Sequence, residues 1–183
     1  LRLLLDGAVA VGLLEKHDGR YALTPATAAT LVRGAPHDLT KAIAYNRDVY
    51  PAWGRLTQLV RTGRPVEAPA LHLGSDAERT RRFALAMHSR ALGIGRAIVP
   101  QLHLPKGARV LDLAGGPGTY ALLMAQQDPT LTCDTVDLPA IAEVAKEITA
   151  PYADRVHCHA GDYHRDTWAP AAYDAVTLFG CLH

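Results

Sequence analysis

Three glycines near the middle of the chain mark a turn that could hold a ligand. The segment from Val110 to Thr119 reads VLDLAGGPGT, so Gly115, Gly116 and Gly118 follow a short apolar run and precede a predicted helix. Glycine allows the backbone to turn tightly and lets a ligand lie against bare main chain. The pattern predicts a binding turn for a nucleoside-containing ligand at the end of a strand.

An acidic residue lies within or at the end of this apolar run and of each of the next two apolar runs along the chain. Asp112 lies within the first run, Asp137 ends the second, and Asp162 follows the third with Tyr163 beside it. At the second position an acid can accept hydrogen bonds from both ribose hydroxyls. We expect Asp162 to accept from an adenine amino group and Tyr163 to lie against the ring. The alternatives are that Asp137 caps a helix and that Asp162 is a turn residue.

Asp112 distinguishes between two classes of adenosyl ligand. A carboxylate behind the turn repels a pyrophosphate, whereas it attracts the ammonium and sulfonium groups of S-adenosylmethionine. The segment also fits a dinucleotide fingerprint, since Ala121 follows Gly116 and Gly118 at the required spacing. The charge favours S-adenosyl-L-methionine, and an NAD(P)-dependent oxidoreductase remains the alternative.

The residues around this turn predict an α/β domain over residues 106–183. Strands alternate with helical segments there, which is typical of a parallel sheet covered by helices. The predicted strands are Arg109–Leu113, Thr132–Asp137, Val156–Ala160 and Tyr173–Phe179. Neighbouring parallel strands bring their carboxyl ends together, so the three acids are expected to meet at one edge.

The first 105 residues predict a mostly helical domain. Apolar residues at helical spacing begin at Leu1, and Asp18-Gly19 between two short apolar runs predicts a hairpin. Thr24 and Pro25 then start a second helix as its cap and first residue. Helix, hairpin and helix outline a winged helix.

Longer helices are expected between the hairpin and the glycine turn. Residues 37–62 are predicted to be helical, residues 64–69 form a loop, and Ser75 or Asp76 caps a helix to about Leu102. The apolar stripe of this last helix is Phe83, Met87, Ala91, Ile94 and Ile98. The charged run of Arg79, Arg81 and Arg82 near its start is expected to be a solvated face.

Composition limits the partners and the compartment. The 183 residues are 49% hydrophobic and 20% charged with a formal net charge of +1, so nucleic acid and membrane are not expected as partners. The three cysteines, Cys133, Cys158 and Cys181, predict small buried thiols in a reducing cytoplasm. His157 and His159 flank Cys158, but alternation along a strand points them away from it, so no metal site is expected.

Seven segments together resemble a known family over essentially the whole chain. They are Leu4–Thr24, Arg61–Pro65, Phe83–Met87, Leu111–Gly118, Asp137–Pro139, Gly161–Tyr163 and Cys181–His183. The family is that of small-molecule O-methyltransferases with an N-terminal winged-helix dimerisation domain. It includes plant caffeic-acid-type enzymes, acetylserotonin methyltransferases and bacterial enzymes acting on carotenoids and polyketides.

The resemblance implies roles for individual residues. Asp112 and the turn Ala114, Gly115, Gly116 and Gly118 would hold the methionine part of the cofactor. Asp137 would bind ribose, Leu138 would lie beside the adenine, and Asp162 and Tyr163 would frame it. Met87 would help to wall the acceptor pocket, although a methionine in a helix stripe is more often core. Ala114 departs from the usual glycine and should be tolerated if its φ is negative.

The implied reaction is in-line transfer of the sulfonium methyl to a hydroxyl of a small molecule. His183 falls at the position of the family's general base, and a histidine pKa near 6.5 suits removal of a phenolic proton with a pKa near 10. Arg90 is a weaker candidate for the cofactor carboxylate. The resemblance also implies a homodimer through the N-terminal helices.

Two further hypotheses remain open at this point. A winged-helix transcription regulator with a fused ligand-binding domain should carry a basic recognition helix. Residues 1–11 hold one cation, Arg2, and one acid, Asp6, which favours dimerisation over DNA binding. A methyltransferase fold that performs other chemistry is also possible. The missing initiator Met and four predicted strands, against seven in the family, indicate a fragment whose last strand is an unpaired edge.

Overall fold

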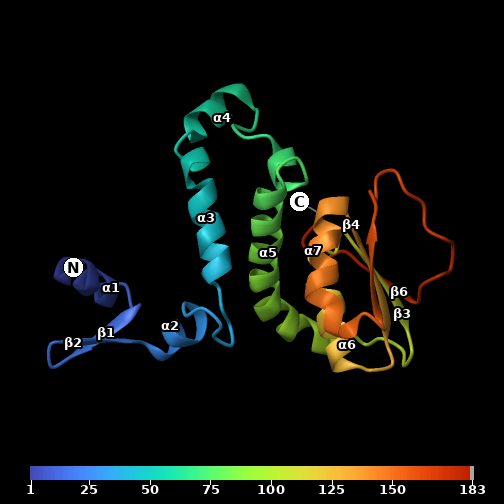
Figure 1. The fold of residues 1–183 in the computed structure, drawn as a ribbon, viewed down its shortest axis with the longest axis horizontal. Coiled ribbons are helices and arrows are strands. Elements are labelled where there is room, and N and C mark those ends of the chain that lie inside the picture. The colour runs from blue at the N-terminus through green and yellow to red at the C-terminus, as the bar shows by residue number, and fades with distance from the viewer. Residues whose placement is uncertain (182–183) are drawn as a thin grey trace.

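The computed structural model describes residues 1–181, in which a helical N-terminal half leads into a parallel sheet (Figure 1). The predicted α/β class is therefore confirmed. Leu182 and His183 lie outside the described residues.

The N-terminal elements follow the predicted order of helix, hairpin and helix. They are α1 (Arg2–Ala10), β1 (Leu14–His17), β2 (Arg20–Leu23) and α2 (Pro25–Thr30). Asp18 and Gly19 have φ angles of 50° and 73°, as a type I′ hairpin turn requires. The Thr24 hydroxyl accepts a hydrogen bond from the Thr27 N–H at 3.2 Å, so it caps α2 as predicted. That these elements constitute a winged helix remains a prediction.

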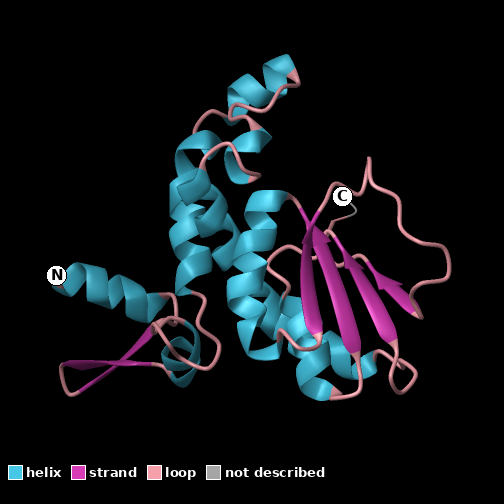
Figure 2. Ribbon diagram, turned by 45° about the vertical axis from the view of Figure 1, so that its right-hand side comes forward, coloured by secondary structure: helices cyan, strands magenta, loops and turns pink. Residues whose placement is uncertain are grey.

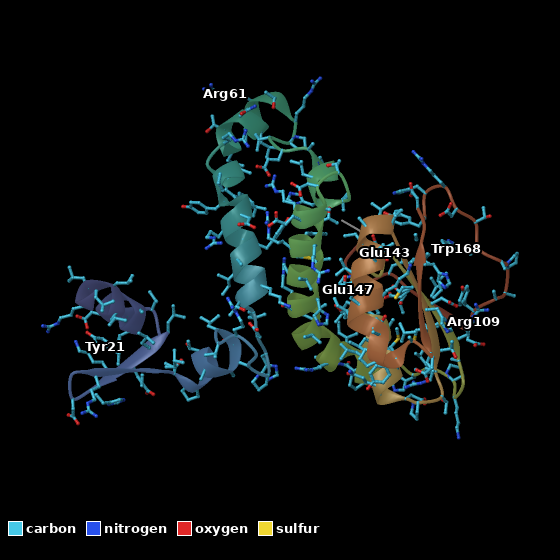
Figure 3. The ribbon with its side chains drawn as sticks, in the orientation of Figure 1. Tyr21, Arg61, Arg109, Glu143, Glu147 and Trp168 are labelled. Atoms are coloured by element: carbon cyan, nitrogen blue, oxygen red, sulfur yellow. The ribbon has the colours of Figure 1, made fainter. Side chains whose placement is uncertain are left out.

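One acid ties α1 to the hairpin. Asp6 accepts hydrogen bonds from Lys16 Nζ at 2.6 Å and from the Tyr21 hydroxyl at 2.7 Å. Tyr21 is labelled in Figure 3, beneath α1. These contacts fix the angle between helix and hairpin, which share little buried apolar surface.

The predicted helical region of residues 37–62 is divided into two helices, α3 (Thr40–Trp53) and α4 (Leu56–Thr62). Gly54 ends the first, and Gly63 ends the second in the left-handed conformation, with φ of 63°. A short 3₁₀ turn, Pro69–His72, then leads to α5 (Ala77–Ile98). Asp76 caps α5 by accepting from the Arg79 N–H at 2.9 Å.

α5 differs from its prediction at its end and in its buried face. It stops at Ile98 because Pro100 interrupts the helical hydrogen bonds, and Val99–Gln101 form a 3₁₀ turn. The predicted apolar stripe is confirmed only in part, because Ile94 is 53% exposed, whereas the other four residues of the stripe are half-buried. The buried residues are instead small, namely Thr80, Ala84, Ala86, Ser89 and Gly95. The reason is that α5 lies between α3 on one side and α6 and α7 on the other, and close helix contact favours small residues.

The sheet contains four parallel strands in the order β5-β4-β3-β6. These are β3 (Arg109–Leu113), β4 (Thr132–Asp137), β5 (Val156–Ala160) and β6 (Ala175–Thr177). The first three match the predicted strands, whereas β6 is shorter than the predicted Tyr173–Phe179. Between them run α6 (Thr119–Gln127), α7 (Pro139–Thr149) and a 3₁₀ turn, Ala150–Tyr152.

Helices cover one face of the sheet (Figure 2). Val110 and Cys133 from the strands pack there with Met124 of α6 in the main core. The opposite face carries a polar cluster: Asp134 accepts from Arg109 Nη2 at 2.8 Å and lies 2.7 Å from His159 Nε2. A hollow of about 570 Å³ borders this face, and Figure 3 shows two of its lining residues, Arg109 and Trp168, on the side of the sheet away from α7.

The cysteines are only partly as predicted. Cys133 is buried, and burial raises the pKa of its thiol to about 12, whereas Cys158 and Cys181 are half-buried. No helix within residues 1–181 is long and apolar enough to span a membrane.

Candidate functional site

The glycine turn joins the central strand β3 to α6. The Gly115 N–H donates to the Val136 carbonyl at 3.1 Å, and the Gly118 N–H donates to the Gly115 carbonyl at 3.0 Å. Gly116 and Gly118 have φ angles of 57° and 70°, which disfavour any side chain. Gly118 is the cap residue of α6, so the turn presents backbone at a helix N-terminus.

Asp112 lies directly behind this turn, in the middle of a row of three polar residues. Its register partners are Thr135 on β4 and Thr177 on β6, and all three face the helices. The Thr177 hydroxyl donates to Asp112 Oδ1 at 2.7 Å. Among the described residues, Asp112 Oδ2 and Thr135 Oγ1 are the buried side-chain oxygens that have no hydrogen-bond partner.

Gly115 covers these two oxygens. A Cβ atom added to it would lie 2.1 Å from Thr135 Oγ1 and 2.6 Å from Asp112 Oδ2, so any larger residue would collide with both. Burial raises the pKa of the Asp112 carboxyl to about 7, against the hydrogen bond from Thr177, and the nearby Asp137 charge raises it further. A buried acid without a full set of partners is typical of a site that interacts with a ligand.

Asp137 at the end of β4 holds the turn. Its Oδ2 accepts from the Gly116 N–H at 2.8 Å, and its Oδ1 accepts from the Leu138 N–H at 2.7 Å. Burial raises the pKa of this carboxyl, although both hydrogen bonds lower it. Asp137 is not the cap residue of α7, a position that Leu138 occupies. Each carboxylate oxygen keeps further acceptor capacity for a ligand hydroxyl.

Asp162 and Tyr163 follow β5, next to the end of β4. The two strand ends are joined by the Gly161 N–H, which donates to the Asp137 carbonyl at 2.9 Å. Asp162 Oδ1 accepts from the His164 N–H at 3.0 Å, as in a turn, and the Tyr163 ring lies 4.1 Å from the His164 ring between centroids. Tyr163 is 40% exposed, so its ring is accessible to a ligand.

Ala114 does not meet the condition under which we expected it to be tolerated. Its φ is +51°, in the left-handed region where a Cβ is strained. The turn therefore imposes a glycine conformation on an alanine.

The two candidate site residues on α5, Met87 and Arg90, differ in their exposure. Met87 is half-buried and Arg90 is exposed. Their neighbour His88 reaches the turn: its Nδ1 lies 2.9 Å from the hydroxyl of Thr119, the first residue of α6. Burial lowers the pKa of His88, so it is neutral at pH 7. His183, the predicted general base, lies outside the described residues.

Sequence reasoning missed the two threonines beside Asp112. Thr135 and Thr177 occupy strand positions where a β-branched residue needs no functional explanation. Only the strand register, which pairs both with Asp112, reveals their role. The available signal was that each stands two residues before the end of a predicted strand.

A parallel sheet in which a strand leads through a glycine turn into a helix, with acids in or directly after three neighbouring strands, is the arrangement of the Rossmann-like folds. Residues 53–183 match the model of the O-methyltransferase domain family, and the chain belongs to that family. The resemblance inferred from the motifs is thereby confirmed.

Individual relatives agree with this assignment. The chain is 31% identical to 3-hydroxy-5-methyl-1-naphthoate 3-O-methyltransferase of Streptomyces sahachiroi, over 99% of this chain and 54% of that protein. It is 28% identical to acetylserotonin O-methyltransferase of Gallus gallus, over 98% of this chain and 56% of that protein. The structure of human N-acetylserotonin methyltransferase in complex with SAM shares the fold, with a TM-score of 0.79, 23% identity, and coverage of 97% and 55%. The chain thus spans about half the length of the relatives it matches.

Proposed function

We propose that the protein transfers the methyl group of S-adenosyl-L-methionine to a hydroxyl of a small molecule. The observation that carries this proposal is the buried Asp112 carboxylate, whose Oδ2 has no partner and lies directly behind the glycine turn. A negative charge in this low-dielectric position attracts the cationic amino acid part of the cofactor. The same charge opposes the pyrophosphate of NAD.

The residues around the turn fit the rest of the cofactor. Ala114, Gly115, Gly116 and Gly118 would hold the methionine part with bare backbone. Asp137 would accept from the ribose hydroxyls with the acceptor capacity that its two backbone hydrogen bonds leave. Leu138, Asp162 and Tyr163 follow the ends of β4 and β5 and would border the adenine.

The chemistry divides between cofactor and protein. When bound, S-adenosylmethionine supplies a methyl group already activated by its sulfonium. The protein must align the acceptor oxygen with that methyl and remove the acceptor proton. We assign the second task to His183 and place Met87 of α5 on the acceptor side, and Arg90 of the same helix is the candidate for binding the cofactor carboxylate. The polyketide and aromatic acceptors named for the relatives support an aromatic or polyketide-like hydroxyl here.

Calorimetric titration of the intact protein with S-adenosylhomocysteine tests this function. We expect micromolar or tighter binding, no binding of NAD, and at least tenfold weaker adenosyl binding in Asp137→Asn. The asparagine keeps the size of the side chain but has a single acceptor, so it can keep only one of the two backbone hydrogen bonds. Circular dichroism of the variant provides the control. Binding of NAD in preference to S-adenosylhomocysteine would contradict the proposal.

We also propose a homodimer through α1. Leu3 and Leu4 of this helix are 89% and 73% exposed, an apolar surface that a second copy would cover. Light scattering should give the mass of a dimer for the wild-type protein and of a monomer for Leu3→Ser/Leu4→Ser. Val60→Ser, at an exposed apolar position of α4, is the control and should leave the dimer intact. The free thiols at Cys133, Cys158 and Cys181 support a cytoplasmic location.

A further inference from the structure

Within residues 1–181, the side chain of Asp112 accepts one hydrogen bond, which comes from the Thr177 hydroxyl. Thr177 Oγ1 lies 2.7 Å from Asp112 Oδ1, while Asp112 Oδ2 has no partner among the described residues. The aspartate side chain is fully buried, so no solvent replaces the missing contacts. A buried carboxylate in these surroundings depends on its single donor to remain charged.

The sheet register fixes this donor. Asp112 and Thr177 are direct partners on the parallel strands β3 and β6, so their side chains leave the sheet on the same face. Thr135 occupies the equivalent place on β4, but its hydroxyl makes no hydrogen bond with Asp112. The hydroxyl on the β6 side therefore holds Oδ1, which leaves Oδ2 next to Gly115 at the glycine turn.

We propose that Thr177 is a positioning residue of the cofactor site, whose hydroxyl orients the Asp112 carboxylate and sustains its negative charge behind the glycine turn. This inference rests on the proposed function, because the charge matters only if the turn receives a cationic ligand. Thr177 acts through Asp112 and needs no contact with the ligand itself.

The other titratable groups around Asp112 are few. Asp137 at the end of β4 raises the pKa of Asp112. Cys133 on β4 and Tyr120 on α6 interact with the Asp112 charge, and burial raises the pKa of both, so they remain neutral near pH 7. The hydrogen bond from Thr177 acts in the opposite direction, since it lowers the pKa of Asp112. Removing the hydroxyl should therefore raise that pKa above its value of about 7.

The first measurement needs no ligand. In uniformly ¹³C-labelled intact protein, the Asp112 carboxyl signal is assigned from its loss in Asp112→Asn and is followed by NMR from pH 5 to pH 9. We expect Thr177→Val to raise the pKa of Asp112 by about one unit, because a donor to the charged form is lost without a change in volume. Thr177→Ser, which retains the hydroxyl, should restore the wild-type value. Thr132→Val, the same change elsewhere in the sheet, should not shift it.

The second measurement follows the affinity for S-adenosylhomocysteine by calorimetry. A one-unit rise from about 7 reduces the ionised fraction of Asp112 at pH 7 by about fivefold. Thr177→Val should therefore bind about fivefold more weakly than wild type at pH 7, and the ratio of the two dissociation constants should approach one at pH 8.5. Thr177→Ser should follow the wild type at both pH values.

The outcomes separate the two proposals. If the wild-type protein does not bind S-adenosylhomocysteine, the proposed function fails and the role of Thr177 fails with it. If the wild type binds, an unchanged Asp112 pKa in Thr177→Val overturns the role of Thr177 alone. An equal loss of affinity at pH 7 and pH 8.5 also overturns it, because a merely structural defect would not depend on the ionisation of Asp112.

Discussion

Asp112 is a residue whose charged form the folded protein disfavours. Burial raises the pKa of its carboxyl to about 7 from 3.8. Protonation of Asp112 therefore stabilises the folded state, and this contribution is fully present below pH 3.8 and lost as the pH rises through about 7. Where Asp112 is ionised, the fold carries a buried charge that a single hydrogen bond stabilises.

Asp112→Asn should consequently stabilise the protein at alkaline pH while weakening adenosyl binding. The gain in unfolding free energy over wild type should decrease by roughly 4 kcal/mol from pH 8.5 to pH 4, since one pKa unit corresponds to about 1.36 kcal/mol. Denaturant titrations of both proteins at the two pH values measure this difference in unfolding free energy. Asp154→Asn, at an acid that is 74% exposed, is the control and should show no comparable change. A pH-independent difference for Asp112→Asn would contradict the prediction.

Ala114 offers a second test at the level of a single residue. Its φ of +51° strains an alanine, whereas a glycine adopts it freely. Ala114→Gly should raise the free energy of unfolding by about 1 kcal/mol. Ala171, with φ of 54° in the loop before β6, is the matched control, because Ala171→Gly should give a similar gain without altering adenosyl affinity. Destabilisation by Ala114→Gly would show that the strain is absent.

At this scale the sequence predicted the acids and glycines but not the contacts between them. Spacing alone indicated that Asp112 and Asp137 would meet near the turn. Spacing could not indicate that Asp137 would accept a hydrogen bond from the Gly116 N–H, or that the Thr177 hydroxyl would donate one to Asp112. Both contacts depend on strand order and register, which arise from tertiary packing.

Helix α5 shows the same limit at the level of an element. Its existence and a cap at Ser75 or Asp76 followed from pattern and capping chemistry, and the structure places the cap at Asp76. Its buried face did not, because the helix contacts α3 as well as α6 and α7. An apolar stripe predicts one covered face, whereas a helix packed on two sides is selected for small residues where its neighbours come closest.

Two glycines on α5 make this packing testable. A Cβ at Gly95 would lie 2.4 Å from Leu123 Cδ1 and 3.3 Å from the Tyr120 ring, whereas a Cβ at Gly93 would meet nothing within 4 Å. Gly93→Ala should stabilise the protein by roughly 0.5–1 kcal/mol through helix propensity. Gly95→Ala should destabilise it by about 1 kcal/mol or more, because overpacking exceeds that gain. Thermal unfolding distinguishes the two, and equal effects would contradict the close approach of α5 and α6.

Across the whole molecule, the parallel sheet was the most predictable part. Alternation of strands and helices indicated it, and three of the four strands have the predicted bounds. The division into residues 1–105 and 106–183 remains a prediction. The length of β6 was overestimated, because apolar residues such as Leu178 and Phe179 continue the strand pattern beyond the residues that pair with β3.

The position of β6 affects the behaviour of the 183-residue polypeptide in solution. It pairs with β3 on one side and forms an edge of the four-stranded sheet, with Val176 half exposed. Exposed edge strands promote association, and an added lysine opposes it. Val176→Lys should slow the rise of light scattering during concentration at least twofold. Gln126→Lys on the exposed side of α6 adds the same charge away from the edge, and an equal effect there would assign the change to net charge alone.

The placement of α5 has a consequence for how members of this family can exchange parts. The helix belongs to the N-terminal half by sequence, yet it packs against α6 directly after the glycine turn, at Gly95 and Leu123. A chimera joined near residue 105 would combine α5 of one parent with α6 of the other. The residues on the two sides of this contact would then come from different proteins. A chimera joined before Asp76 would inherit both sides of that contact from one parent. That junction would instead divide the contact between α3 and α5, so each of the two junctions leaves one face of α5 against a helix from the other parent.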